Sequence, residues 1–291
     1  MGDAKQKRDR RRQILDAHPW CIYCGAHATT TDHCPPKSAF RGRNWPDTYE
    51  FPACEPCNSG ARLDEQVLAA LFRSDFAEGN DAQLAEWEKL AQGVKNNQPA
   101  IAAEWQVPTR NEIKRILRLA YGSEGDRRRQ RGWSAIYIGP RTQAVIDRFM
   151  IKLSKALYFK HNNHAFDGVL YTHHINKLRV DTTPEYLAGV YAMAPSLPTV
   201  DRNKKSLSDQ FIYRFNHNPE HRVMYAVVEF GVQWVFQLMA VGREMDESLV
   251  SKEETGSLSF RHECFLDPDS DLVVSAAGKN ADPLGRPTSP A

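Results

Sequence analysis

Apolar residues recur at helical spacing in several stretches before residue 160. The first stripe predicts a helix that begins near Asn58 or Ser59. Its apolar positions are Leu63, Val67, Leu68, Leu71 and Phe72. A repeat around Trp87 predicts another helix, and Thr109-Arg-Asn-Glu112 is a capping box that predicts the start of a third. An amphipathic helix with one face in the core is also expected from about Gln143 to Phe159.

The last third of the chain changes to the pattern of β-strands. Three segments rich in β-branched and aromatic residues are separated by turn signals: Phe211 to Phe215, Val223 to Phe230 and Val232 to Val241. In the third, apolar residues alternate with Gln233 and Gln237, as on a half-buried antiparallel strand. A shorter β-prone stretch, Ala28 to Thr31, leads into Asp32-His33 and ends at Pro35-Pro36. The expected fold class is α+β with antiparallel strands.

Two stretches interrupt these patterns and are predicted to be loops. Tyr121 to Gly132 contains Gly122, Gly125 and a run of arginines, which favours an exposed charged loop. Four histidines surround the turn-like Asn162-Asn163: His161, His164, His173 and His174. Because no carboxylate stands at a fixed spacing from them, a solvated loop is favoured over a second metal site.

The chain of 291 residues has room for one large or two modest domains, and 41% hydrophobic content is ordinary for a soluble globular protein. The expected parts are a basic N-terminal arm (1–17), a cysteine-rich module (18–76), a helical then α+β domain of unknown role (77–275) and a disordered tail (276–291). The net charge of +2 is too small to indicate nucleic acid by itself. No apolar stretch suits a signal peptide or a membrane span, so a cytoplasmic protein without a membrane partner is expected.

Two C-x-x-C pairs, Cys21-Ile-Tyr-Cys24 and Cys54-Glu-Pro-Cys57, are the most specific signal in the chain. Each such turn can present two thiolates on one side of a tight loop, so two turns can fill the tetrahedral shell of a zinc ion. A filled shell leaves no position for water, and the zinc is therefore expected to be structural. The alternative is a set of four buried free cysteines. Cys34 and Cys264 lie outside the pairs and are interpreted as small buried hydrophobic residues.

The residues between and just after the cysteine pairs suit hydrolytic chemistry. Asp32 and Asn58 carry hard oxygen atoms of the kind that Mg²⁺ prefers, and a zinc cluster could bring them together across the sequence. His33 has an imidazole whose ordinary pKa is near neutrality, which suits a general base. On a strand its side chain would point away from that of Asp32, unless the strand ends or bulges there, as Pro35 allows.

The segment from Cys21 to about Glu65 resembles the HNH endonucleases, in the subgroup whose ββα-metal fold is clamped by a four-cysteine zinc. The resemblance implies that His33 activates water and that Asp32 and Asn58 hold one divalent cation, Mg²⁺ or Mn²⁺. The run Asp32-His33-Cys34-Pro35-Pro36-Lys37-Ser38 is also similar to a subgroup of largely uncharacterised HNH proteins with a long C-terminal extension. The activity implied is hydrolysis of phosphodiester bonds in nucleic acid, with DNA favoured by the family.

Two positions depart from the family pattern. The middle Asn, which orients the base histidine, has no clear counterpart: Asn44 and Asp47 lie near the expected place, and Tyr49 occupies another alignment. Cys34 stands where an aliphatic residue is more usual. Neither change removes a ligand or the base, but loss of the orienting Asn would weaken catalysis or mark a degenerate site.

Four basic residues near the site could neutralise the phosphates that flank a scissile bond: Lys37, Arg41, Arg43 and Arg62. A solvated surface charge is the alternative for each of them, and Trp45 could either stack on a base or cover the zinc module. The leading hypothesis is a metal-dependent HNH endonuclease, with phage defence or restriction as one version of its role. The alternative is a catalytically inactive zinc module that binds nucleic acid or protein.

Overall fold

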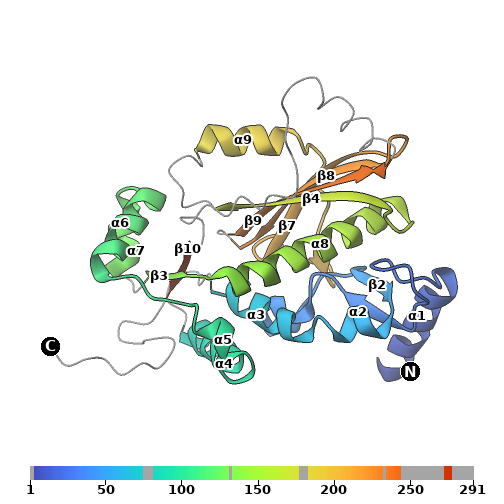
Figure 1. The fold of residues 1–291 in the computed structure, drawn as a ribbon, viewed down its shortest axis with the longest axis horizontal. Coiled ribbons are helices and arrows are strands. Elements are labelled where there is room, and N and C mark those ends of the chain that lie inside the picture. The colour runs from blue at the N-terminus through green and yellow to red at the C-terminus, as the bar shows by residue number, and fades with distance from the viewer. Residues whose placement is uncertain are drawn as a thin grey trace.

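The computed structural model describes residues 3–74, 81–130, 133–176, 183–231, 234–243 and 272–276. Within these ranges the protein is α+β with antiparallel sheets, as predicted (Figure 1). The helices are α1 (Asp3–Ala17), α2 (Glu55–Ser59), α3 (Arg62–Phe72), α4 (Asp81–Asn97), α5 (Pro99–Ala102), α6 (Arg110–Tyr121), α7 (Glu124–Gln130), α8 (Pro140–Asn162) and α9 (Pro184–Ala192). The strands are β1 (Thr30–His33), β2 (Glu50–Ala53), β3 (Trp133–Tyr137), β4 (Gly168–Asn176), β5 (Asp201–Arg202), β6 (Lys205–Ser206), β7 (Phe211–Asn218), β8 (Val223–Phe230), β9 (Trp234–Gly242) and β10 (Leu272–Ala276).

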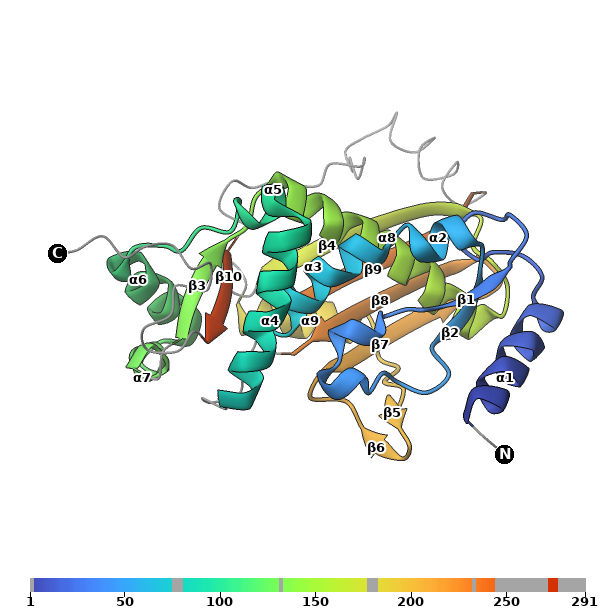
Figure 2. The same ribbon diagram turned by 90° about the horizontal axis from the view of Figure 1, so that it is seen from below.

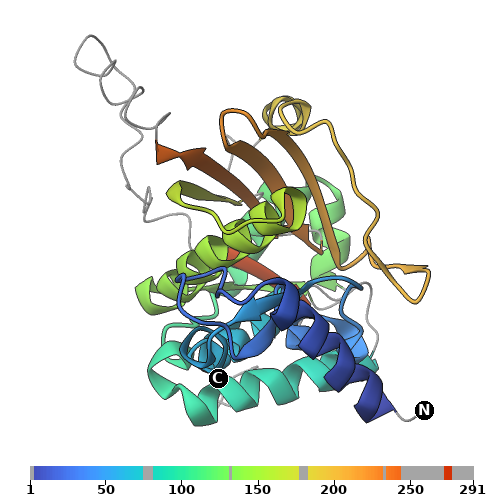
Figure 3. The same cartoon turned by 90° about the vertical axis from the view of Figure 1, so that its right-hand side faces the viewer.

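A four-stranded sheet with the order β4-β9-β8-β7 lies at the centre of the molecule. The long helix α8 lies on one side of this sheet and α9 on the other, so the sheet is a middle layer (Figures 1 and 3). Side chains along β8 alternate between the two sides: Val228 and Phe230 join the main core, whereas Val227 packs in a second cluster with Val190 of α9. Both faces of β8 are therefore covered by other parts of the protein.

Residues 18–74, here called the knuckle segment, contain the cysteine pairs and the predicted catalytic residues. In this segment β1 and β2 pair as antiparallel strands, with Asp32 opposite Phe51 and His33 opposite Glu50. Asp32 is buried and His33 is half-buried, because successive side chains of a strand point to opposite faces. The short helix α2 begins directly after Cys54, and α3 follows it and contacts α8 (Figure 2).

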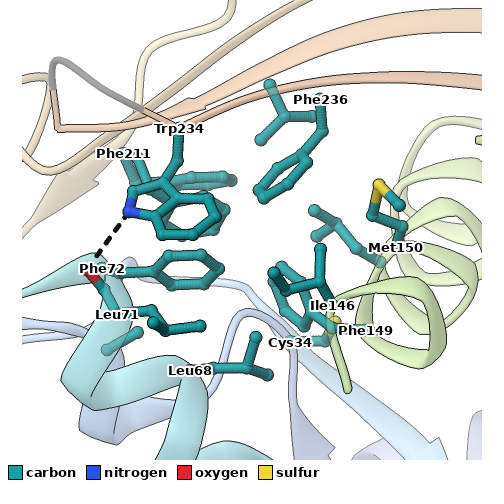
Figure 4. Packing of buried hydrophobic residues seen from close by; sticks show 14 of the residues in the cluster. Cys34, Leu68, Leu71, Phe72, Ile146, Phe149, Met150, Phe211, Trp234 and Phe236 are labelled. Carbon is teal, nitrogen blue, oxygen red and sulfur yellow. Dashed lines mark hydrogen bonds between the residues drawn. The ribbon is translucent and has the colours of Figure 1, made fainter. Parts of the chain in front are cut away.

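The knuckle segment and the central sheet share one hydrophobic core (Figure 4). The ring of Phe72, at the end of α3, stacks on Phe230 of β8 with 4.2 Å between ring centroids. The indole Nε1 of Trp234 on β9 donates a hydrogen bond of 3.1 Å to the backbone oxygen of Leu71. The core is thus continuous across the predicted boundary after residue 76.

The N-terminal arm is one helix, α1, and it is attached to the β1–β2 hairpin. Arg10 Nε lies 3.3 Å from Glu50 Oε2, and Arg11 donates a hydrogen bond of 2.6 Å to the backbone oxygen of Thr29. At the opposite end of the molecule, the β3–β10 pair lies beside α6 and α7 (Figure 2). In the described part of the chain, no helix combines the length and apolar character that crossing a bilayer requires.

Several predicted elements are confirmed. The amphipathic helix from about residue 143 to 159 lies within α8, and the capping box of Thr109 and Glu112 begins α6. The three strands expected in the last third are β7, β8 and β9, although Val232 and Gln233 lie outside the described residues. Cys264 and residues 277–291, most of the predicted disordered tail, also lie outside them.

The loop predicted from Tyr121 to Gly132 is wrong for most of its length, because α7 occupies it. One of its arginines has an acidic partner close by: Arg127 Nη1 lies 3.1 Å from Glu124 Oε2 within the helix. Arg118 of α6 lies 2.7 Å from Asp126 Oδ2 and ties the two helices together. Gly122 ends α6 and Gly125 lies within α7, so the two glycines mark a break between two helices and not a loop.

The loop predicted around the four histidines is confirmed for His164, which lies between α8 and β4, and is wrong for the other three. His161 belongs to α8, and His173 and His174 belong to β4, where the ring of His174 stacks on Trp234 at 5.0 Å between centroids. The polar pair Asn162-Asn163 marks the end of α8 instead, with Asn163 in the left-handed conformation that often follows a helix.

Candidate functional site

The four paired cysteines converge as the sequence predicted. Their sulfur atoms all lie within 4.8 Å of one another, and the Sγ atoms of Cys24 and Cys54 are 3.5 Å apart. A tight turn holds the first pair, because Gly25, with φ of +77°, donates its backbone N–H to the oxygen of Cys21. The second pair lies at the start of α2, where Cys54 is the N-cap and Cys57 is one turn further on. Four cysteines arranged in this way could hold a metal ion such as zinc.

A cleft of about 960 Å³ lies beside this cluster and brings predicted residues from distant parts of the sequence together. The predicted base and both predicted cation ligands line it, together with three of the four predicted phosphate-binding residues: Asp32, His33, Asn58, Lys37, Arg43 and Arg62. The fourth basic residue, Arg41, pairs with Asp209 at 3.2 Å and lines a different, smaller cavity. The cleft therefore combines carboxylate, amide, imidazole and cationic groups in one place.

Asp32 is held by two partners inside the protein. Its side chain is 2% exposed, and its Oδ2 accepts a hydrogen bond of 2.6 Å from the hydroxyl of Tyr23. The ammonium of Lys152, from α8, lies 3.0 Å from the same oxygen. Burial raises the pKa of Tyr23 well above its usual range, and the charge of Asp32 adds to this effect, so the phenol stays a proton donor.

Glu65 adds a second carboxylate next to Lys152. Its Oε1 lies 3.7 Å from the ammonium, and both side chains are largely buried. Burial, with the charge of Asp32 adding to it, raises the pKa of Glu65 to about 7, although Lys152 opposes the shift. Burial alone would favour neutral Lys152, but its acidic neighbours, Asp32 first, keep its pKa above the usual range. Lys152 is therefore a charged group placed between two carboxylates.

His33 presents a neutral imidazole to the cleft. Its Nε2 is 3.9 Å from Oε1 of Glu50, the residue opposite it in the hairpin, and Thr31 Oγ1 donates to the same oxygen at 2.7 Å. Burial lowers the pKa of His33 to about 3, and the charges of Lys37, Arg10 and Arg202 add to this effect. An imidazole that is unprotonated at neutral pH can accept a proton from water.

Asn58 points toward β1 from α2. Its Nδ2 donates hydrogen bonds to Thr30 Oγ1 at 3.2 Å and to the backbone oxygen of Thr31 at 3.1 Å. Because both bonds use the amide nitrogen, Oδ1 is the atom that Asn58 can offer to a cation. These bonds also fix α2 against the strand that carries Asp32.

The residues considered for orienting His33 have other contacts. Asp47 accepts hydrogen bonds of 2.8 Å from Arg202 and from the backbone N–H of Asn203, and so attaches the β5–β6 hairpin to the loop between β1 and β2. The Tyr49 hydroxyl donates to Tyr213, and Asn44 is exposed. An orienting role for Asp47 or Asn44 stays a prediction, while Glu50 supplies a carboxylate near the imidazole.

Trp45 lies beside His33, one of the residues that line the cleft. The two rings meet edge to face at 5.3 Å between centroids. Lys37 Nζ is 4.0 Å from the centre of the indole, and the guanidinium of Arg202 is 4.2 Å from it. Trp45 therefore organises cationic side chains around the predicted base.

The sequence missed Lys152, Glu65 and Glu50. Lys152 belongs to no motif, but it lies on a basic stripe of α8 with Arg148 and Lys155 at helical spacing, next to the apolar face. Glu50 would have been found from the hairpin register, had the residues of β2 been predicted.

In comparisons with known proteins, no family model matches the chain, and neither the curated proteins nor the solved structures contain a significant match.

Proposed function

We propose that this protein is a metal-dependent endonuclease of the HNH type, which hydrolyses phosphodiester bonds of nucleic acid. The observation that carries the proposal is that Asp32, His33 and Asn58 line one cleft beside four clustered cysteines. These are the residues to which the family resemblance assigns the base and the ligands of one divalent cation. DNA is favoured as the substrate by that resemblance alone.

In this proposal the cysteine cluster holds a structural zinc. Four thiolates complete the tetrahedral shell, so no position is left for water or substrate. The metal would join the turn at Cys21 and Cys24 to the start of α2 at Cys54 and Cys57. That junction fixes the position of Asn58, the residue after Cys57 in α2, relative to β1.

The catalytic cation, Mg²⁺ or Mn²⁺, would be held by Asp32 and Asn58. The donor set fits, because Asp32 can offer Oδ1, Asn58 can offer Oδ1, and hard cations of this kind take few protein ligands beside water and phosphate oxygens. When bound, the cation supplies stabilisation of negative charge on the scissile phosphate and on the departing oxygen.

The remaining chemistry belongs to the protein side chains. His33 accepts the proton of the attacking water at an imidazole nitrogen, and the carboxylate of Glu50 lies 3.9 Å from its Nε2. Lys37, Arg43 and Arg62, which line the cleft, bind phosphates on either side of the scissile bond. The expected products carry 5′-phosphate and 3′-hydroxyl ends.

The proposal is tested by cleavage of supercoiled plasmid and of labelled single-stranded DNA and RNA with Mg²⁺, Mn²⁺ or EDTA. Wild-type protein should cut in either metal and be inactive in EDTA, and His33→Ala should reduce the rate by about 10²-fold to 10⁴-fold. His27→Ala is the matched control, because His27 is an exposed histidine of the same segment. Equal cutting by wild type and His33→Ala would refute the assignment of the base.

One observation favours the alternative of a non-catalytic zinc module. Lys152 and Tyr23 already satisfy Oδ2 of Asp32, so the protein tolerates this buried carboxylate without a metal. A non-catalytic module would bind nucleic acid with unchanged affinity in His33→Ala and would cut no substrate in any metal. Binding without cutting in the plasmid assay would therefore select this alternative.

A further inference from the structure

Helix α8 presents a row of basic side chains to the knuckle segment. Arg148 makes two hydrogen bonds to Asp64, of 2.8 and 2.9 Å, and Lys155 donates to the backbone oxygen of Tyr23 at 2.6 Å. Between them, Lys152 reaches Asp32. Of these three residues, Lys152 is the one whose charge is directed at a proposed cation ligand.

The ammonium of Lys152 and a divalent cation would compete for the same group. Lys152 Nζ is 3.0 Å from Asp32 Oδ2, and the Asp32 side chain is 2% exposed, so solvent can do little to screen one positive charge from another. A buried carboxylate requires a positive or hydrogen-bonding partner, and Lys152 meets this requirement when no cation is bound. Any cation that Asp32 takes must therefore weaken or replace the contact with Lys152.

Glu65 offers the displaced ammonium a second position. Its Oε1 is already 3.7 Å from Lys152 Nζ while Asp32 Oδ2 is 3.0 Å away, so a small rotation of the flexible lysine side chain would move the ammonium closer to Glu65 and away from Asp32. The side chain of Lys152 is 17% exposed and that of Glu65 is 28% exposed, so both are largely but not completely shielded from solvent. The two carboxylates therefore give Lys152 two partners between which its ammonium can shift.

We propose that Lys152 sets the affinity of the cleft for its divalent cation, by neutralising Asp32 in the cation-free protein and pairing with Glu65 when a cation binds Asp32. The inference rests on the proposed cation site at Asp32 and Asn58. It assigns to the C-terminal part of the chain, through α8, control over a site built by the N-terminal part. Lys152 is a positioning residue in this account, because it acts through Asp32 and not on the substrate.

The test is Mn²⁺ binding to zinc-loaded protein, measured by titration calorimetry and by the electron paramagnetic resonance signal of free Mn²⁺, without nucleic acid. Lys152→Met should tighten the Kd for Mn²⁺ at least about tenfold, because a competing positive charge is removed. Glu65→Gln should weaken Mn²⁺ binding several-fold, because Lys152 then has Asp32 as its remaining carboxylate partner and competes more strongly with the cation. Asp32→Asn should abolish binding.

Controls separate this effect from a general disturbance of α8. Lys155→Met removes a neighbouring lysine that contacts only a backbone oxygen in the knuckle segment, and its Kd should equal that of wild type. If Lys152→Met fails to fold, Lys152→Gln keeps a hydrogen-bond donor to Asp32 without the charge and should also tighten binding. Lys152→Arg keeps the charge and should remain close to wild type.

The outcomes are distinguishable from those of the proposed function. Mn²⁺ binding that depends on Asp32 but has the same Kd in wild type, Lys152→Met and Lys152→Gln would overturn the inference and leave the nuclease proposal intact. Mn²⁺ binding by Lys152→Met and Lys152→Gln, with no binding by wild type, would support the inference most strongly. Absence of binding in wild type and in every Lys152 variant would overturn both.

Discussion

The knuckle segment and the central sheet are built on different principles. The two strands of the knuckle hairpin have four residues each, and the segment carries its chemistry in short motifs. Strands β7, β8 and β9 have eight or nine residues and are rich in apolar side chains that fill two cores. Cysteine spacing organises the first region, and apolar periodicity organises the second. A site predicted from motifs in one region can therefore depend on a residue without a motif in the other.

The largest expected effect follows from breaking the metal cluster. Cys54→Ser with Cys57→Ser should remove about one zinc per chain, and structural zinc sites contribute on the order of 10 kcal/mol. Zinc content by mass spectrometry and thermal unfolding measure the two effects. Cys34→Ala is the control, because Cys34 is buried but lies outside the cluster, and it should keep the zinc. A folded double variant with unchanged stability would show that the cysteines are not a structural clamp.

The next effect tests whether the two regions fold together. Phe72→Ala removes a ring that stacks on Phe230 and contacts Phe149, and should cost about 3–5 kcal/mol in free energy of unfolding. Leu63→Ala in the same helix is the control, since Leu63 is 52% exposed and should change stability by less than about 0.5 kcal/mol. Denaturant unfolding should give one transition for both regions. Two transitions, of which only one shifts in Phe72→Ala, would mean that the regions fold independently.

A smaller effect concerns nucleic-acid binding by the knuckle segment. Arg62 is exposed and lines the cleft, so Arg62→Ala should weaken DNA binding uniformly across sequences and reduce the salt dependence of log K by about one unit. Arg41→Ala is the matched control, because Arg41 pairs with Asp209 outside the cleft lining and should leave the slope unchanged. Fluorescence anisotropy over a range of salt concentrations measures both slopes, and equal slopes in the two variants would rule out a specific role for the cleft arginine.

The smallest effect tests the contact between α8 and α3. The Arg148–Asp64 pair is bidentate but partly exposed, so a double-mutant cycle of Arg148→Ala and Asp64→Ala should give a coupling energy of about 0.5–1 kcal/mol. The exposed Arg243–Asp167 pair serves as the reference and should give a coupling near zero. Equal coupling energies for the two pairs would show that the bidentate Arg148–Asp64 pair does not stabilise the contact between α8 and α3.

The sequence was sufficient for features that depend on spacing. The two C-x-x-C pairs predicted the cysteine cluster, and the alternation of Trp234, Phe236 and Leu238 predicted β9. The helix that became α8 was also predicted, as an amphipathic helix with one face in the core. Local patterns identify such elements because cysteine turns and apolar periodicity are properties of short segments.

Other features depend on tertiary contacts that no local pattern contains. Lys152 reaches Asp32 only because α8 packs against the knuckle segment, and the two residues are far apart in sequence. The resemblance to the ββα-metal fold implied a second strand but did not place it, because Pro52 lies within β2 and weakens the strand pattern. Without its register, Glu50 could not be placed opposite His33. For His173 and His174, the preceding Asn162-Asn163 suggested a loop, but pairing of β4 with β9 over its whole length determines the structure.

The claim that Asp32 and Asn58 hold a catalytic cation is tested most directly by anomalous scattering from crystals of the zinc-loaded protein grown with Mn²⁺. The predicted result is one zinc peak among the sulfurs of Cys21, Cys24, Cys54 and Cys57, and a separate manganese peak between Asp32 and Asn58. A manganese peak elsewhere in the molecule, or none at Mn²⁺ concentrations at which the protein cuts DNA, would contradict the assignment of these two ligands.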